Sequence, residues 1–556
     1  MKKTTNVPGL HCPFRYTRNV CPAARHRLLP NLRTITGLVV ALLTSGCTML
    51  GPDFQTPEAP VADEWLETSD PQVNTQAEEY SDWWTVFNDP VLDHIIELAY
   101  QQNLPLQIAG IRILESRALL GIAIGSQYPQ QQQVSGGITY NEVSERSPNF
   151  LAAFADSSYG AADIGFDAVW ELDVWGRFRR GIEAADANLA ASVATYDDVL
   201  VSLTAECAAT YVQIRTFEER IAIAHQNVTI QQRSLEIALV RFENGATTEL
   251  DVQQAKALLT QTQATIPALA AGLRQAKNAL SVLVGMPPSE LQALLEGPGV
   301  IPTTPAEVAI GMPADLLRRR PDIRAAELQA AAQSAQIGIA RTDLYPQFNL
   351  VGSIGFLSSN TGSSSLSDLF TGDAFTATVG PTFQWPIFNY GRLKNNVRFQ
   401  DATFQGLIVN YQNTVLEAAR EVEDGLVGFL QGQKQAKYLA ESVAASERSV
   451  ELSLLQYRDG VADYQRVLDS QQRLVLSQDR LTATRGDVVT SLISVYKALG
   501  GGWQIRAGHD FVPEETIEEM GTRTDWGELL APEDVQLPDD LPVHEKPDKL
   551  FYKPLW

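Results

Sequence analysis

The sequence has 556 residues and a formal net charge of −23, because 66 acidic residues outnumber 43 basic ones. This charge argues against a nucleic-acid-binding protein, since nucleic-acid phosphates are also negative. Four Cys in so long a chain exclude a disulfide-stabilised scaffold. Six His, with no HExxH, CxxC or Gly-rich phosphate-binding motif, give no support to an enzyme, a bound metal or another cofactor.

Residues 1–46 have the layout of a secretory signal peptide. Seven basic residues and no acidic one precede an apolar run that is too short to span a bilayer, which takes about 20 residues. The run ends in "LTSGC", which resembles a bacterial lipobox. We therefore expect cleavage before Cys47 and a covalent lipid on it, as S-diacylglycerol and an N-acyl chain. An ordinary signal peptide with an incidental Cys is the alternative.

The mature chain would begin with a lipidated segment, residues 47–91. Cleavage removes the seven basic residues, so the formal charge becomes about −30. Thr48 follows Cys47, and no Asp is present there to suggest retention in the inner membrane. We therefore expect a protein anchored by lipid to the outer membrane.

Residues 92–503 consist of two copies of one unit, which we place at 92–300 and 301–503. "LGIAIGSQYPQ" in the first copy matches "IGIARTDLYPQ" in the second, and "EIALVRFENG" matches "ELSLLQYRDG". Chance could give one such match, but it does not explain several in the same order. The sequence therefore predicts two tandem structural repeats.

Each copy contains two predicted β-strands after its Tyr-Pro dipeptide, where a helical pattern changes to a period of two. We place the strands at about 131–141, 162–175, 347–357 and 375–388, each apolar on one side and polar on the other. This length and alternation are typical of transmembrane β-strands between lipid and a wet lumen. The strands of a water-soluble sandwich alternate as well, but they do not usually come in two isolated pairs between long helices.

Four strands cannot close a barrel alone, because open edges in lipid would leave backbone groups unpaired. Several chains must then contribute to one barrel. Two chains give eight strands, whose interior is filled by side chains, whereas three chains give twelve. A conducting pore therefore favours three chains or more.

A very long helix is predicted after the strands of each copy. Residues 176–243 and 391–458 contain no Pro, and apolar positions recur there at heptad-like spacing. A helix of about 68 residues reaches about 100 Å. We expect each helix to turn at Gly245 or Gly460 and to return as a shorter helix.

Residues 504–556 form an acidic tail. Thirteen Asp or Glu lie between Asp510 and Asp548, against Arg523 and Lys546. High charge and few apolar residues predict an extended or disordered segment.

Several motifs in order make the chain resemble the TolC-type outer-membrane factors, nearest to their OprM/NodT lipoprotein branch. They are "WWTVFNDPVLDHIIELAYQQN", "WELDVWGRFRR", "LLRRRPDIRAAE", "IGIARTDLYPQF" and "ALGGGW". The resemblance covers nearly all of residues 47–503. It implies a mixed α and β fold in which a homotrimer builds a 12-stranded transmembrane β-barrel, continuous with a periplasmic α-helical barrel. It also implies that part of the C-terminal tail packs around the waist of that helical barrel.

The resemblance also implies function and partners. The chain would be the outer-membrane exit duct of a tripartite efflux system, together with a periplasmic adaptor and an inner-membrane efflux pump of the RND type. Part of a secretion, oligosaccharide-export or metal-export system is the alternative, followed by a soluble periplasmic coiled-coil scaffold. A glycosidase reading of Glu171 and Asp173 is weaker, because residues i and i+2 of a strand simply share one face.

The resemblance finally suggests a periplasmic gate at the two helix turns. Tyr457 takes the place of a bonding Tyr, with Asp251 as its partner. Asp469 takes a place in a ring of carboxylates around the axis, as in cation-selective pores. Arg466 stands where a second ring Asp is expected, and pairing with Asp463 or with Asp469 remains open. The alternative is that all are solvated charges at a helix turn.

Overall fold

The structure is a computed structural model, which divides into one unit at Met1–Thr48 and a second at Met49–Trp556. The residues described are 49–531, apart from 77–79, 145, 147–156, 289–290, 298, 306 and 363, together with 549 and 551–554. The predicted signal peptide and Cys47 lie outside these residues. All that follows concerns the second unit.

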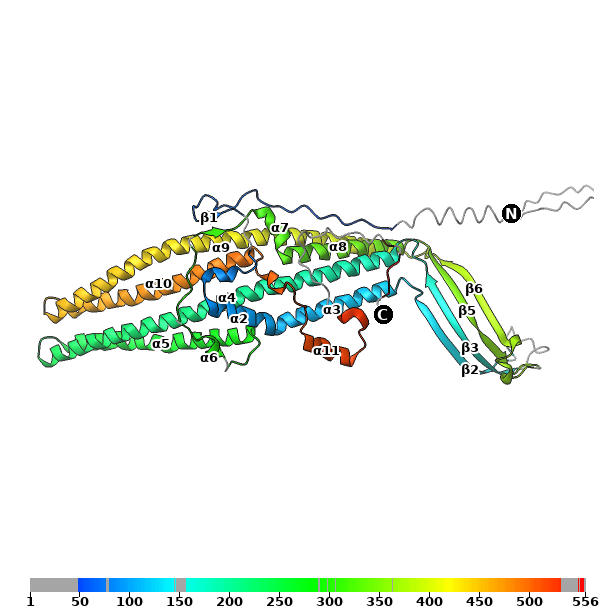
Figure 1. Ribbon diagram of the computed structural model, residues 1–556, viewed down its shortest axis with the longest axis horizontal. Coiled ribbons are helices and arrows are strands. Elements are labelled where there is room, and N and C mark those ends of the chain that lie inside the picture. Colours follow the sequence, from blue (N-terminus) through cyan, green and yellow to red (C-terminus); the bar gives the residue numbers. More distant parts are fainter. Residues whose placement is uncertain are drawn as a thin grey trace, which may run out of the picture. The chain divides into compact units, whose positions relative to one another are not determined.

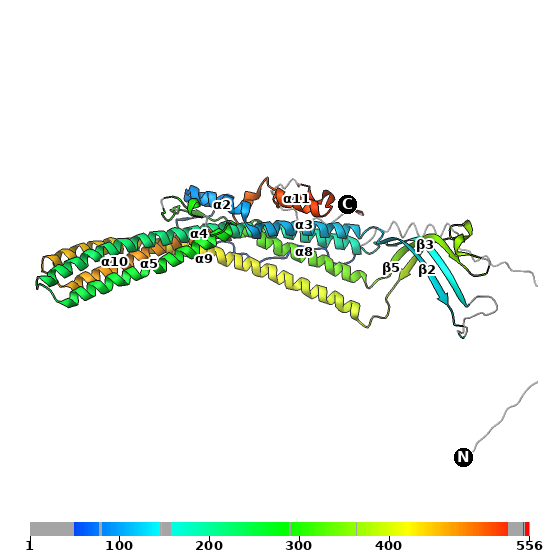
Figure 2. The same cartoon turned by 90° about the horizontal axis from the view of Figure 1, so that it is seen from below.

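Two repeats with the same order of elements form the body of this unit. The first contains α2 (Pro90–Gln102), α3 (Leu104–Gly125), β2 (Gln131–Glu142), β3 (Ser158–Glu171), α4 (Arg177–Glu243) and α5 (Glu249–Leu283). The second contains α8 (Pro321–Thr342), β5 (Gln347–Ser359), β6 (Phe375–Gln384), α9 (Arg392–Arg458) and α10 (Tyr464–Ala498). The tandem repeat is thereby confirmed. Figures 1 and 2 show the two long hairpins, α4–α5 and α9–α10, side by side.

Short elements connect and flank the repeats. A parallel pair joins β1 (Val73–Asn74) to β4 (Val308–Ala309). The short α-helices are α6 (Leu291–Leu294), α7 (Leu316–Arg319) and α11 (Glu514–Arg523). The 3₁₀ helices are η1 (Trp83–Phe87), η2 (Pro313–Asp315), η3 (Leu366–Asp368), η4 (Gly372–Ala374), η5 (Trp503–Arg506) and η6 (Gly527–Leu530).

The long helices agree with the sequence prediction, since α4 and α9 each have 67 residues. Each hairpin turns at a Gly in the left-handed region, with φ of 68° at Gly245 and 76° at Gly460. This conformation costs other residues energy but is open to Gly, which commonly follows a helix end. Across the described residues, every helix is either too short or too polar to cross a membrane.

Four strands form one antiparallel sheet in the order β2-β3-β5-β6. β2 and β5 match their predicted bounds to within two residues, whereas β3 lies four residues earlier at both ends and β6 stops four residues early. β3 stops at Glu171 because Asp173 turns away to cap α4, accepting hydrogen bonds from the backbone N–H groups of Phe178 and Arg179, each at 3.1 Å. β6 stops at Gln384, shortly before Pro386, which has no N–H to donate to a ladder.

The main hydrophobic core lies where α2, α4 and α10 meet, around Trp83, Trp84 and Tyr496. Trp83 stacks on Tyr496 with ring centroids 5.4 Å apart. The chain after α10 must pass close to this cluster. A Cβ atom at Gly501 would lie 2.8 Å from the Tyr80 carbonyl oxygen, so only Gly fits there without a shift.

The first part of the tail is not extended or disordered as its composition predicts, because η5, α11 and η6 pack on the helices, and this agrees with the partial order that the resemblance implies. Arg506 explains this order. Its guanidinium lies over the rings of Trp503 and Phe511, and it forms a buried ion pair with Asp197 of α4. Burial raises the pKa of Asp197, and Arg506 opposes that rise. The acidic composition of the tail gave no indication that these few residues would anchor it to the helices. Residues 532–548 lie outside the described part.

We expect Arg506→Leu to lower the free energy of unfolding by about 3 kcal/mol, because the buried Asp197 carboxylate would lose its main ion-pair partner. Thermal unfolding of the detergent-solubilised protein measures this. Arg523→Leu, at an exposed position on α11, serves as the control and should change stability by less than about 0.5 kcal/mol. Equal losses in the two variants would contradict the role given to Arg506.

Candidate functional site

One face of the four-stranded sheet is apolar. Residues directly opposite each other in antiparallel strands share a face, and the register aligns Val134 with Phe166, Phe166 with Ile354, and Ile354 with Ala377. Large apolar side chains on this face are exposed, among them Ile138 at 82% and Val379 at 80%. An exposed apolar sheet face of this size requires a partner or a lipid environment.

The opposite face is polar. It carries Gln, Ser, Thr and Asn, and its charged side chains within the described strands are all acidic: Asp163, Asp167 and Glu171. Ser135 donates a hydrogen bond of 3.1 Å to Asp167 across the β2–β3 pair. The predicted sharing of this face by Asp173 is wrong, because Asp173 lies beyond β3 and caps α4.

The tips of the two hairpins are joined at Tyr457, which is 1% exposed. Its hydroxyl donates a 3.2 Å hydrogen bond to Oδ2 of Asp251, on α5. Thr247 donates to the same oxygen atom. Burial raises the pKa of Tyr457, so its hydroxyl remains a donor at neutral pH. The structure thus brings together the two residues that the sequence paired, and their role in a gate stays a prediction.

Arg241, near the end of α4, is the tip residue that the sequence analysis missed. Its guanidinium lies 4.8 Å from the centroid of the Tyr457 ring. It donates to the carbonyl oxygens of Tyr457 at 2.8 Å and of Arg458 at 3.2 Å, which are the last residues of α9. A cation is favourable at a helix C-terminus. Arg in the last turn before "FENG" was the available signal, but its target lies in the other repeat.

The remaining gate candidates lie on exposed positions at the start of α10. Asp469 accepts a 3.0 Å hydrogen bond from Gln465. Asp463 precedes the first residue of α10, and its side chain makes no capping hydrogen bond. Among the ion pairs of the described residues in this single chain, none joins Arg466 to Asp463 or Asp469, and the two suggested pairings stay predictions. The exposed side chain of Arg466 has water as an alternative to either partner.

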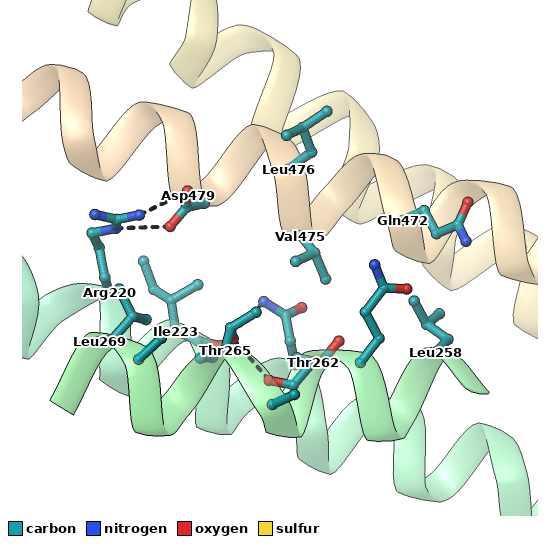
Figure 3. Close-up of a pocket in the computed structure, with 15 residues that line it drawn as sticks. Arg220, Ile223, Leu258, Thr262, Thr265, Leu269, Gln472, Val475, Leu476 and Asp479 are labelled. Atoms are coloured by element: carbon teal, nitrogen blue, oxygen red, sulfur yellow. Dashed lines mark hydrogen bonds and ion pairs between the residues drawn. The ribbon is translucent and has the colours of Figure 1, made fainter. Parts of the chain in front are cut away.

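A cavity of about 760 Å³ lies among α4, α5 and α10. Each helix contributes residues spaced three or four apart, which is one helix face. Figure 3 shows Leu258, Leu269, Val475 and Leu476 around it, with the ion pair of Arg220 and Asp479 at one end. That pair is bidentate, at 2.8 and 3.1 Å, and it ties α4 to α10. Three helix faces around one space resemble a bundle that lacks its fourth helix.

Comparison with known proteins agrees with this architecture. The family model described as outer membrane efflux protein matches residues 95–286 and 312–501, one match for each repeat. The solvent efflux pump outer membrane protein SrpC of Pseudomonas putida is 31% identical over 477 residues, covering 84% of this chain and 97% of that protein. Nodulation protein T of Rhizobium leguminosarum bv. viciae is 29% identical, covering 84% and 93%.

Solved structures are also similar. The outer-membrane channel OprN has a TM-score of 0.75 and 30% identity, covering 82% of this chain and all of that chain. The open state of the Neisseria gonorrhoeae MtrE outer membrane channel has a TM-score of 0.67 and 26% identity, covering 82% and 99%. With both repeats matched and most of its length aligned to efflux proteins, the chain belongs to the outer membrane efflux protein family.

Proposed function

We propose that three copies of this chain form the outer-membrane exit duct of a tripartite efflux system, which passively conducts substrates delivered by an inner-membrane pump of the RND type through a periplasmic adaptor. The observation that carries the proposal is the sheet with one apolar and one polar face, joined directly to the long helices α4 and α9. Such a sheet suits a wall between lipid and water.

The need to close the sheet into a barrel supports the trimer. Strands β2 and β6 each have a partner on one side only, and an unpaired edge in lipid costs several kcal/mol for each free backbone group. Pairing β6 of one copy with β2 of the next removes both edges. Three copies give a twelve-stranded barrel, in the range of known barrels, whereas eight strands would leave no room for a wide pore.

The duct would also carry a lipid anchor at Cys47. Met49 and Leu50 support this assignment because they are held where β3 passes into α4. Leu50 N–H donates to the Trp175 carbonyl at 3.0 Å, and Arg180 Nε donates to the Leu50 carbonyl at 3.1 Å. The first two residues of the second unit are thereby fixed beside the end of a strand that would span the membrane.

Mass spectrometry of the mature N-terminus tests the anchor. We expect Cys47 to carry a thioether-linked diacylglycerol and an amide-linked acyl chain, because several chains are needed for stable anchoring. Cys47→Ala should remove both lipids and still leave part of the protein inserted through its barrel. An unmodified Cys47 thiol in protein isolated from outer membranes would refute the assignment.

The gate would lie at the hairpin tips, opposite the strands along the same helices. Asp251, Tyr457 and Arg241 tie the α4–α5 hairpin to the α9–α10 hairpin, so opening requires that these contacts part. Three copies would place three Asp469 carboxylates around one axis, where like charges repel and cations are attracted. We propose Arg241 as a positioning residue that holds Tyr457 toward Asp251.

Planar-bilayer recording tests both the duct and its gate. The wild-type protein should insert as a trimer, checked by native mass spectrometry, and conduct. Tyr457→Phe should shift the equilibrium between closed and open states toward open by roughly tenfold or more, because it removes a hydrogen bond to a charged group worth about 1.5–3 kcal/mol. Arg241→Met should act in the same direction, and Asp469→Ala should lower the preference for cations.

Arg458→Met is the matched control, because Arg458 is exposed at the same tip and its salt bridge is to neighbouring Asp459. Its conductance should equal that of the wild type. An unchanged conductance and cation preference in Tyr457→Phe, Arg241→Met and Asp469→Ala would refute the gate while leaving the duct intact. Absence of any conducting trimer would refute the duct itself.

The cavity among α4, α5 and α10 would receive a helix of the periplasmic adaptor. Its three open helix faces and apolar centre suit the helix-in-groove mode of recognition. Its volume of about 760 Å³ is enough for several side chains of an inserted helix. The ion pair between Arg220 and Asp479 would fix the groove width at one end.

Filling the cavity should weaken this docking. We expect Ala268→Trp, at an exposed position that lines the cavity, to reduce co-purification of the adaptor by roughly tenfold, since overpacking costs about 1–3 kcal/mol. Ala271→Trp, exposed on the same helix but outside the cavity, should have little effect. Equal retention of the adaptor by both variants would rule out this groove.

A further inference from the structure

The C-terminal end of the chain returns to the junction of the helices and the sheet. The described residues there are 549 and 551–554, which we call the C-terminal segment. The Tyr128 hydroxyl donates to the Tyr552 carbonyl oxygen, and Tyr552 N–H donates to Oε1 of Gln127 at 3.2 Å. The centroid of the Phe551 ring lies 6.4 Å from the ring centroids of both Tyr128 and Trp170. These contacts fasten the segment between the end of α3 and the end of β3.

This junction carries a concentration of aromatic side chains at the helix end of the sheet. Trp170 belongs to the apolar face, since it lies opposite Leu350 in the register. The ring centroids of Trp175 and Tyr345 lie 4.9 Å apart, and Trp385 is 51% exposed. Aromatic residues gather where a membrane protein passes from hydrocarbon to water. Phe551, which is 50% exposed, extends this group with a ring from outside both repeats.

The charge of the C-terminal segment is opposite to that of the chain. The chain has a net charge of −23, whereas the last eight residues, "KLFYKPLW", contain two Lys and no acidic side chain. The Lys553 side chain is 80% exposed, and Glu528, its salt-bridge partner, is 3.9 Å away and equally exposed. Such a weak pair leaves the ammonium group free to exchange partners. Lys beside exposed aromatic rings is the composition that binds an anionic lipid surface.

We propose that the C-terminal segment is a membrane-interface anchor, in which Lys549 and Lys553 contact the head groups of anionic phospholipids while Phe551 and Tyr552 lie at the boundary with the hydrocarbon. The anchor rests on the proposed function, because it requires the sheet to lie in a bilayer. The family match ends at residue 501, so the anchor is an addition to the two repeats.

Quenching in proteoliposomes tests the anchor with the full mature chain. A fluorophore is attached at Pro554→Cys, and the vesicles contain phosphatidylethanolamine, phosphatidylglycerol and a phospholipid with a nitroxide on its head group. The same fluorophore at Glu519→Cys, an exposed position on α11, is the control site, and the wild-type chain gives the labelling background. We expect strong quenching at 554 and little at 519.

Replacing Lys549 and Lys553 by Gln should lower the ratio of membrane-bound to unbound segment by about fivefold for each Lys, because each Lys loses its attraction to the anionic surface. Phosphatidylcholine in place of phosphatidylglycerol should have a similar effect. The anchor would be overturned by equal quenching at 554 and 519, or by quenching that stays the same after the Lys replacements and the lipid exchange. Conductance measured in the same vesicles would still support the duct. Dissociation of the trimer in Phe551→Ser would instead assign the segment to a subunit contact and also overturn the anchor.

Discussion

An unpaired strand edge cannot lie in lipid, because each free backbone N–H or C=O group there costs several kcal/mol. The sheet of this chain has two such edges, at β2 and β6, and only four strands. The chain therefore completes its hydrogen bonding only in an assembly. Contact with lipid accounts for the exposed apolar face of the single chain, and pairing of the strands into one sheet requires both repeats to place their strand pair at the same end of the helices.

The two repeats share a backbone plan but have specialised at their tips. Helices α4 and α9 are equal in length, and so are α5 and α10, with 35 residues each. The first tip supplies Arg241 and Asp251, and the second supplies Tyr457. Because each residue finds its partner in the other repeat, neither hairpin can form this cluster alone. Duplication thus provided the frame, and divergence of a few side chains made the two halves depend on each other.

Sequence reasoning succeeded where the signal is local and periodic. Alternation placed the four strands, Pro-free heptad-like runs placed α4 and α9, and Gly245 and Gly460 marked the turns. It failed where a residue acts on a distant part of the chain. Arg506 orders the tail through Asp197, which is 309 positions away, and Arg241 caps a helix 216 positions away. It also failed at one local site, where Asp173 continues the period-two pattern but its carboxylate caps α4, five residues further on. The period-two pattern alone does not show whether a carboxylate lies on the face of a strand or caps the helix that follows.

The length of the returning helices has a mechanical consequence. A helix of 35 residues is about 52 Å long, so a small rotation of the α9–α10 hairpin about a point near Gly500 would be amplified at its tip, which carries Tyr457 and Asp469. A rotation of about 5° at this point moves the far end by about 5 Å, given that rise per residue. Such a displacement of the α9–α10 tip is large enough to break the 3.2 Å hydrogen bond from the Tyr457 hydroxyl, on that hairpin, to Asp251, on the other hairpin. Core packing around Trp83 and Tyr496 could therefore remain almost undisturbed while the contacts at the tip separate completely.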